Sequence, residues 1–217
     1  MMHQLEADSI QLQFGGRRIL TDIYLKCETG KITGLLGRNG QGKSCLMQII
    51  YGSLPGEKSV RFDNQVHFEA FKRPDLLLYL PQFNFIPASL SLRRIFQDFE
   101  LDYAAFAQRF PEFASRYKTQ IGRLSGGGRR LVEIYAVVKS KSQFALLDEP
   151  FTHLNPVQVE KVKEFLRAEK SNKGLFLTDH MFRHVMEICD TVNLLVNGKT
   201  HLVNSFEDIE TFGYARL

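Results

Sequence analysis

Apolar and polar residues alternate at the beginning of the chain, and further along the apolar residues gather into short runs between helical stretches. Residues 5–14 alternate with the period of a half-buried strand. After a pair of glycines, the apolar spacing continues through Ile19, Ile23 and Leu25. This pattern predicts an antiparallel hairpin at the start of the chain.

Four short runs are mainly apolar, which is typical of strands buried on both faces of a sheet. They are Ile32–Leu36, 76–80, 144–147 and 175–178, and a glycine-rich loop joins the first of them to a predicted helix over Lys43–Tyr51. Strands that alternate with helices favour an α/β fold with a mainly parallel sheet covered on both faces.

The pattern between residues 89 and 140 is helical only, with Ser91 placed to cap a helix over 92–99. We therefore expect a helical subdomain inserted into the sheet. Near the end, residues 192–196 and 200–203 flank Asn197-Gly198, which predicts a two-residue hairpin turn.

No linker composition interrupts the chain, so a single domain over residues 1–217 is expected. Within it, the expected parts are an antiparallel β subdomain at about 1–30 and 56–72, a helical subdomain at about 84–140, and a core that holds the remainder.

Composition narrows the possible functions only slightly. The 28 basic and 24 acidic residues give a formal charge of +4 without long blocks of one sign, which suits phosphate ligands and does not imply nucleic acid. The three cysteines lack the spacing of a disulfide framework or a metal site, and we expect free thiols. No apolar run approaches the roughly 18 residues of a membrane helix, so membrane association would need a partner.

A glycine-rich loop between the first apolar run and the first helix matches the pattern GxxxxGK[ST]. Glycines let backbone amides turn towards an anion, the helix N-terminus adds positive potential, Lys43 reaches the outer phosphates and Ser44 ligates magnesium. The alternative is a glycine-rich turn with a chance lysine. The candidate nucleotide-binding residues here are Gly37, Arg38, Asn39, Gly40, Gln41, Gly42, Lys43, Ser44 and Cys45.

Cys45 stands where a hydroxyl residue often follows this motif. It either removes one hydrogen bond to the α-phosphate or packs against the sheet, and packing is the favoured interpretation.

A phosphate loop fits kinases, GTPases and helicases alike, and two further motifs distinguish between them. The segment Leu124 to Gly128 reads LSGGG and resembles the LSGGQ signature of ABC ATPases. The apolar run at 144–147 ends in Asp148-Glu149-Pro150, which resembles the Walker B strand of the same family. Taken alone, the first would be an ordinary helix N-cap and the second a solvated turn, but they occur in the family's order and at its spacing.

The resemblance implies the RecA-like fold of P-loop NTPases and assigns roles to these residues. Asp148 would hold Mg²⁺ through water, and Glu149 would orient or deprotonate the attacking water. Ser125, Gly126 and Gly127 would cap the γ-phosphate of an ATP bound to the opposite subunit.

Three weaker matches complete the resemblance. Gln82 resembles the Q-loop glutamine that contacts magnesium and water, His180 the switch histidine that binds the γ-phosphate, and Phe14 the aromatic residue that stacks on adenine. Each has an ordinary alternative, as a loop residue, a helix-start residue and a core residue respectively. With Lys43 and Glu149, Gln82 and His180 form the expected catalytic set.

Two positions depart from the family pattern. Gly128 replaces the signature glutamine, and Asn155 replaces an aspartate that normally links the two sites across the dimer. Asn155 can instead cap the helix that Pro156 begins, which is the favoured interpretation.

The resemblance implies the ATP-binding and ATP-hydrolysing subunit of an ABC transporter, with ATP and Mg²⁺ as ligands. Its expected partners are a second ABC ATPase subunit and a separate membrane-spanning permease, with no nucleic acid, at the cytoplasmic face of a membrane. Two alternatives stay open: a soluble ABC protein that acts on ribosomes or DNA, and a nucleotide-binding regulator with little turnover.

Overall fold

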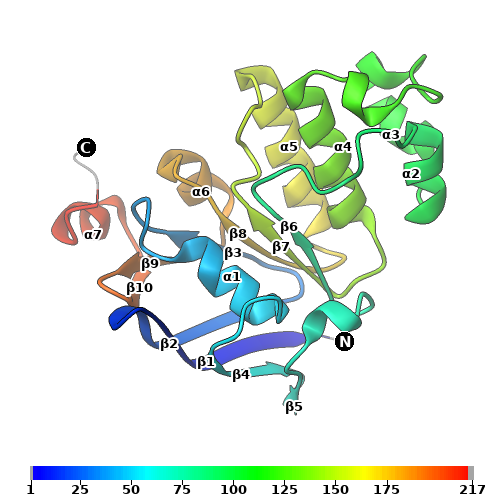
Figure 1. The fold of residues 1–217 in the computed structure, drawn as a ribbon. Coiled ribbons are helices and arrows are strands. Elements are labelled where there is room, and N and C mark those ends of the chain that lie inside the picture. The colour runs from blue at the N-terminus through cyan, green and yellow to red at the C-terminus, as the bar shows by residue number, and fades with distance from the viewer. Residues whose placement is uncertain (1, 215–217) are drawn as a thin grey trace.

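The computed structural model describes residues 2–214, and its centre is a six-stranded sheet (Figure 1). The strand order is β10-β9-β3-β8-β7-β6, parallel except for the edge strand β10. The bounds are β3 Ile32–Leu36, β6 Leu77–Leu80, β7 Phe144–Asp148, β8 Gly174–Thr178, β9 Thr191–Val196 and β10 Lys199–Val203. The predicted apolar strands and the terminal hairpin are thus confirmed.

A second, antiparallel sheet has the order β2-β1-β4-β5. Its strands are β1 Gln4–Phe14, β2 Arg17–Glu28, β4 Glu57–Phe62 and β5 Gln65–Val66. The predicted first hairpin is present, but Ile19 is only partly buried, whereas Leu20 is buried together with Ile23. The register shifts between these residues, and Asp22 has a φ of 52°, so a bulge reverses the alternation that the sequence suggested.

Helix α1, Lys43–Tyr51, lies between the two sheets (Figure 1). The helices α2 to α5 lie together at one end of the molecule (Figure 1). These are α2 Leu92–Asp98, α3 Tyr103–Arg109, α4 Gly126–Lys139 and α5 Pro156–Glu169. The remaining helices are α6 Phe182–Ile188 and α7 Phe206–Thr211, with 3₁₀ turns at Ala70–Lys72, Pro111–Phe113 and Ile121–Arg123. Across residues 2–214, every helix is too short or too polar to cross a membrane.

Side chains of the parallel sheet enter two different hydrophobic cores. Leu175 and Leu177 of β8 pack with the helices α4 and α5, whereas Phe176 between them packs with α1 and the antiparallel sheet. Successive residues of a strand point to opposite faces, so the sheet is covered on both sides, as its mainly apolar runs predicted.

A buried lysine beside β8 leads to a prediction about stability and pH. Lys173 is 2% exposed, and its ammonium donates to the Ser140 carbonyl (2.7 Å) and to the Ser142 hydroxyl (3.1 Å). Burial nevertheless lowers the pKa of Lys173 to about 8. From about pH 8 to the unfolded pKa near 10.5, the unfolded chain binds a proton that the folded chain lacks, so stability from this group rises with pH.

We expect the free energy of unfolding of the parent protein, relative to Lys173→Met, to increase by about 2 kcal/mol between pH 7 and pH 10. Urea unfolding at several pH values measures this difference. The exposed Lys118→Met variant should show no such trend, and a pH-independent difference for Lys173→Met would contradict the prediction.

Candidate functional site

The phosphate loop joins β3 to α1 with the backbone conformations that its glycines permit. Gly40 and Gly42 have φ values of 79° and 99°, in the left-handed region that side chains disfavour. A Cβ atom on Gly42 would also lie 2.8 Å from the side chain of Ile19. Position 42 therefore requires glycine for its backbone conformation and for its lack of a side chain. Without a side chain there, the loop can pack closely against β2 before α1 begins.

Lys43 is buried, and its ammonium donates to the carbonyls of Gly37 (2.7 Å) and Arg38 (3.3 Å). Burial lowers the pKa of Lys43, and the carboxylates of Glu149 and Asp148 oppose that shift. The Lys43 ammonium thus binds carbonyls at the start of its own loop. Lys43 also lines the open space next to the N-terminus of α1.

A hollow of about 510 Å³ opens in front of this loop, and we call it the P-loop hollow. Its volume is typical of sites for small organic ligands. The residues that line it are Phe14, Ile19, Asn39, Gly40, Gly42, Lys43, Ser44, Cys45, Gln82, Glu149 and His180. All but Ile19 were predicted from the sequence, although they come from five separate stretches of the chain.

Several predicted residues do not line the P-loop hollow. They are Gly37, Arg38, Gln41, Ser125, Gly126, Gly127 and Asp148. The side chains of Arg38 and Gln41 turn away from it: Arg38 donates to the Gly213 carbonyl, and Gln41 accepts from the Asn197 amide (3.2 Å). Only the backbone of these two residues is left to face a ligand, and the sequence analysis invoked the backbone amides of this loop.

Phe14, the last residue of β1, is 51% exposed and lines the hollow beside Ile19. An aromatic ring this exposed leaves a face free for a flat ligand group. The alternative interpretation, that Phe14 is a residue of the hydrophobic core, is therefore wrong. Cys45 is partly buried and packs against the core between the two sheets, as its favoured interpretation predicted.

The acidic end of β7 lies beside the P-loop hollow, and its two carboxylates have different surroundings. Asp148 is buried, and its oxygens accept hydrogen bonds from the hydroxyls of Tyr79 (3.0 Å) and Thr178 (2.9 Å). Each carboxylate oxygen has a second lone pair, so Asp148 keeps the capacity to accept from a further donor. These bonds fix the orientation of its side chain.

Glu149 occupies the centre of a polar cluster. Its Oε2 accepts from the amide of Gln82 (2.7 Å) and the hydroxyl of Thr152 (3.4 Å), and it lies 3.7 Å from Nδ1 of His180. Glu149 itself has a φ of 48°, a conformation that costs a non-glycine residue about 1–3 kcal/mol and that is frequent at functional sites. The structure thus brings together three of the four residues expected to be catalytic, next to Lys43.

Asp179 fixes the turn that carries His180. It is fully buried at the end of β8 and accepts from the amides of Phe151 (3.2 Å) and Met181 (2.9 Å). Burial raises the pKa of Asp179. Its position directly before a histidine, after an apolar strand, is a signal by which it could have been singled out from the sequence.

The serine-glycine segment lies at the start of α4, where the Ser125 hydroxyl accepts from the Gly128 amide (3.1 Å) and caps the helix. Ser125 and Gly128 line a different hollow, of about 160 Å³. A Cβ atom on Gly127 would lie 2.6 Å from the side chain of Gln158, so this glycine is required for close packing. Gly126 and Gly127, the other two residues of the expected phosphate cap, line neither hollow. The serine-glycine segment is therefore separate from the P-loop hollow.

Asn155 has the role of a helix cap. Its side chain accepts from the Gln158 amide (2.9 Å), and the Gln158 side chain accepts in return from the Asn155 amide (3.2 Å). Pro156 is the first residue of α5. The favoured interpretation of Asn155 is confirmed.

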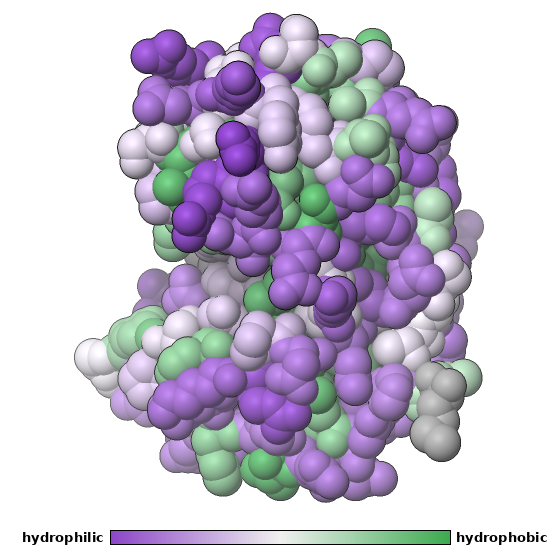
Figure 2. Space-filling model, turned by 90° about the vertical axis from the view of Figure 1, so that its right-hand side faces the viewer, coloured by the Kyte–Doolittle hydropathy of each residue, from purple (hydrophilic) through white to green (hydrophobic). Residues whose placement is uncertain are grey.

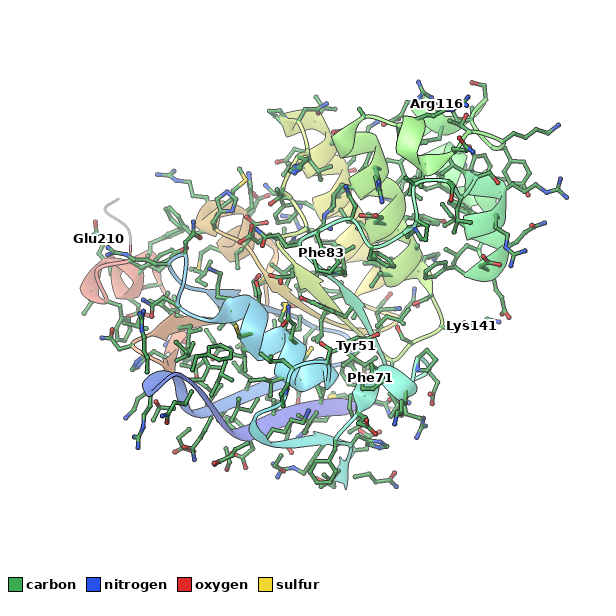
Figure 3. The ribbon with its side chains drawn as sticks, viewed as in Figure 1. Tyr51, Phe71, Phe83, Arg116, Lys141 and Glu210 are labelled. Carbon is green, nitrogen blue, oxygen red and sulfur yellow. The ribbon has the colours of Figure 1, made fainter. Side chains whose placement is uncertain are left out.

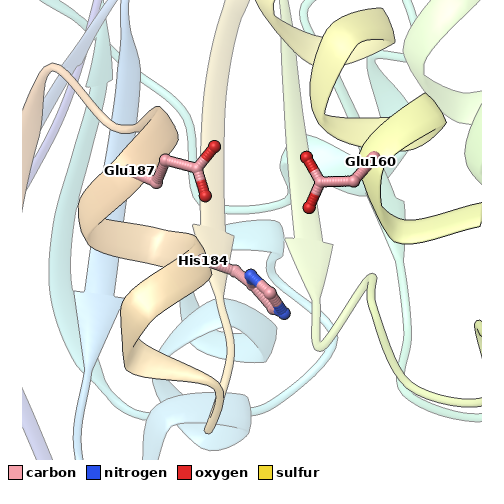
Figure 4. A group of neighbouring side chains, drawn as sticks. All are labelled: Glu160, His184 and Glu187. Atoms are coloured by element: carbon pink, nitrogen blue, oxygen red, sulfur yellow. The ribbon is translucent and has the colours of Figure 1, made fainter. Parts of the chain in front are cut away.

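One further group of side chains could be mistaken for a metal site. Candidate ligand atoms of Glu160, His184 and Glu187 lie within 4.8 Å of one another (Figure 4). The ammonium of Lys163, however, donates to both carboxylates, at 2.8 Å for Glu160. Since a buried cation already compensates their charge, we assign no metal to this group.

The space-filling view shows the molecule indented between the helical end and the sheets (Figure 2). On the face shown there, hydrophilic side chains predominate and hydrophobic ones are scattered.

Comparison with known proteins gives a consistent result. The family model described as ABC transporter matches residues 20–152, more than half of the chain. The lipopolysaccharide export system ATP-binding protein LptB of Acidithiobacillus ferridurans is 28% identical, over 96% of this chain and 93% of the relative. The high-affinity branched-chain amino acid transport ATP-binding protein BraG of Pseudomonas aeruginosa is 24% identical, over 90% of each.

Two solved structures share the fold. The ATP binding subunit of an ABC transporter superposes with a TM-score of 0.80 at 20% identity, covering 97% of this chain and 93% of that one. The ADP conformation of MJ1267, an ATP-binding cassette of an ABC transporter, gives a TM-score of 0.76 at 20% identity, covering 97% and 94%.

Proposed function

The chain belongs to the ABC transporter family as an ATP-binding and ATP-hydrolysing subunit, and from this premise we propose that two such subunits close head to tail around two ATP molecules. In each half of the dimer, the P-loop hollow of one subunit would face the serine-glycine segment of the other. Loss of the γ-phosphate on hydrolysis would then reopen the dimer.

Binding of the nucleotide is supported by the shape and charge of the P-loop hollow. Amides of the loop and of the first turn of α1 would surround the phosphates, and Lys43 would exchange its bonds to loop carbonyls for bonds to phosphate oxygens. Phe14 would stack on the adenine ring with an energy of about 1 kcal/mol.

Hydrolysis would depend on the cluster around Glu149. Its carboxylate would orient a water molecule for in-line attack on the γ-phosphate, while Gln82 holds the carboxylate and His180 contacts the phosphate. Side-chain oxygens of Ser44, Gln82 and Asp148 are hard ligands, which fits Mg²⁺. When bound there, Mg²⁺ would neutralise phosphate charge.

The observation that carries the dimer proposal is that the serine-glycine segment does not line the P-loop hollow of its own chain. One chain therefore has no means of using both on the same triphosphate, whereas two chains that face each other do. Additional support is the exposure of Gly126, at which an added Cβ would meet no atom closer than 3.8 Å.

We expect Ser125→Ala to lower ATP turnover by about 30-fold while the affinity of the isolated subunit for ATP changes less than threefold. The change removes a hydrogen bond to the γ-phosphate that exists only in the closed dimer. Turnover is measured by phosphate release and affinity by titration of a fluorescent ATP analogue at low protein concentration.

The matched control is Ser91→Ala, which removes the N-cap of α2, where the Ser91 hydroxyl accepts from the Arg94 amide. Both changes destabilise a helix start by about 1 kcal/mol, but only the first should reduce turnover. Equal turnover losses in the two variants would speak against the dimer arrangement.

We also propose that the subunit docks on a membrane-spanning partner through the surface after β6, at the cytoplasmic face. Phe83 is 68% exposed there, in the region between the sheet and the helices α2 to α4 (Figure 3). The first segment of the helical subdomain, at about 84–99, would form the other wall of this docking surface.

A further inference from the structure

Arg130 is a buried cation on α4 that contacts the backbone of the catalytic strands. It is 3% exposed. Its Nη1 donates to the Pro81 carbonyl (2.7 Å), and its Nη2 donates to the carbonyls of Asp148 (2.7 Å) and Glu149 (3.0 Å). Helix α4 begins within the LSGGG segment, and we call it the signature helix. One guanidinium therefore connects the signature helix to the ends of β6 and β7.

Two of these three carbonyls belong to residues that carry the proposed chemistry, and the third belongs to the residue before Gln82. Pro81 directly precedes Gln82, and Asp148 and Glu149 are the acidic pair. Strands β6 and β7 are neighbours and end together at this edge of the sheet. The Glu149 carbonyl also accepts from the Thr152 amide (3.3 Å), and the guanidinium adds a charged donor at a shorter distance. The guanidinium thus donates to backbone carbonyls at the ends of both strands at once.

An ordinary buried ion pair is the alternative explanation for Arg130, and the geometry does not favour it. The carboxylate of Glu133, one turn along α4, approaches the Arg130 guanidinium only to 3.9 Å. Within residues 2–214, Nε of Arg130 and Oε2 of Glu133 lack hydrogen-bond partners. The short bonds of Arg130 go to the loop carbonyls and not to the carboxylate.

Glu133 is held mainly by the neighbouring Arg129. It accepts from Nε of Arg129 (3.3 Å) and from the Ile86 amide (3.4 Å), and Arg129 also donates to the Ile86 carbonyl. Arg129 is thus the arginine of α4 that forms the ion pair with Glu133. Arg130 is the arginine that reaches the acidic pair.

We propose that Arg130 is a positioning residue for ATP hydrolysis, which fixes the backbone of Glu149 and of the Gln82 loop against the signature helix. This inference rests on the proposed role of Glu149. Glu149 holds a φ of 48°, which persists only where surrounding contacts enforce it, and the bond from Arg130 to its carbonyl is such a contact. Because Gln82 Nε2 and Glu149 Oε2 lie 2.7 Å apart, a shift of either loop breaks their contact.

The test compares Arg130→Lys with Arg129→Lys. A lysine ammonium is a compact group and cannot span the positions that the two guanidinium nitrogens occupy. For Arg130→Lys we expect kcat to fall at least 20-fold, with KM for ATP and the affinity for ATP within threefold of the parent, because the phosphate loop is untouched. For Arg129→Lys, which keeps the contacts of Arg130, kcat should stay within threefold.

A second readout concerns the pair Arg130 and Gln82. If Arg130 acts by holding Gln82 against Glu149, the kcat of the double variant Arg130→Lys/Gln82→Ala should be within threefold of that of the more impaired single variant. A purely structural role would make the two losses multiply. Arg130→Gln, with a planar group that can reach one carbonyl, is the second variant and should lose kcat in the same way.

The proposal is overturned if Arg130→Lys keeps kcat within threefold of the parent, if Arg129→Lys loses as much as Arg130→Lys, or if neither Arg130 variant folds. The last result would mean that the arginine is required for folding and not for placing Glu149. Failure of the proposed function is distinguishable: in that case Glu149→Gln would itself retain turnover, whatever the Arg130 variants do.

Discussion

Replacing Glu149 by glutamine is expected to lower ATP turnover about 10³-fold and to trap a dimer with ATP bound. A positioned carboxylate that orients or deprotonates the attacking water contributes rate factors of about 10²–10⁴. Glutamine preserves the size and the contact with Gln82 but has no anionic oxygen for the water. Phosphate release measures turnover, and light scattering after gel filtration in saturating MgATP measures the dimer.

The control for this change is Glu164→Gln, because Glu164 is an exposed carboxylate on α5. It should keep turnover within twofold of the parent and should not accumulate a dimer. A Glu149→Gln protein that hydrolyses ATP at the parent rate, or that stays monomeric in saturating MgATP, would refute the assignment of Glu149.

Replacing Lys43 by methionine is expected to weaken ATP binding by about 3 kcal/mol, or roughly 10²-fold in Kd. The lysine supplies charge-assisted hydrogen bonds to the outer phosphates, and methionine fills the same space without a donor. In the protein without nucleotide, methionine removes a buried ammonium whose pKa is already lowered by burial, so thermal stability should not fall. Calorimetric titration with ATP and thermal melts with and without nucleotide measure both effects.

Lys118→Met removes an exposed lysine and should bind ATP with the parent's affinity. If Lys43→Met bound ATP within threefold of the parent, the P-loop hollow would not be the phosphate site. A large drop in the melting temperature of the nucleotide-free variant would show instead that Lys43 supports the fold.

Features with local causes were predictable from the sequence. The bounds of β3 and α1 agree with the predicted ones, because an apolar run, a glycine loop and a helical pattern follow one another within a short stretch. The caps at Ser91, Ser125 and Asn155 were also predictable, since a cap and the amide it accepts from lie within three residues.

Ile19 shows where the local pattern fails. Its apolar spacing predicted a core position, but the bulge at Asp22 turned it towards the P-loop hollow and buried Leu20 in its place. A bulge depends on how two strands pair, and the alternation of apolar residues within one strand does not predict that pairing.

Residues that act through distant partners escaped prediction. The hydroxyls of Tyr79 and Thr178 orient Asp148 across 69 and 30 positions of sequence, and Arg130 reaches the same corner from the signature helix. In the sequence they are ordinary members of apolar strands and of an amphipathic helix, and no motif marks them.

The sequence by itself determined the phosphate loop, the buried strands and the list of polar residues that end them, because these follow from side-chain periodicity and from the backbone freedom of glycine. Only the tertiary structure decided which of those residues meet. The order β3-β8-β7-β6 brings strands far apart in the chain to a common edge, where Gln82 contacts Glu149 across 67 positions and His180 lies beside them. The same packing placed Ser125 in a separate hollow, because α4 begins on the helical side of the molecule and not at that edge.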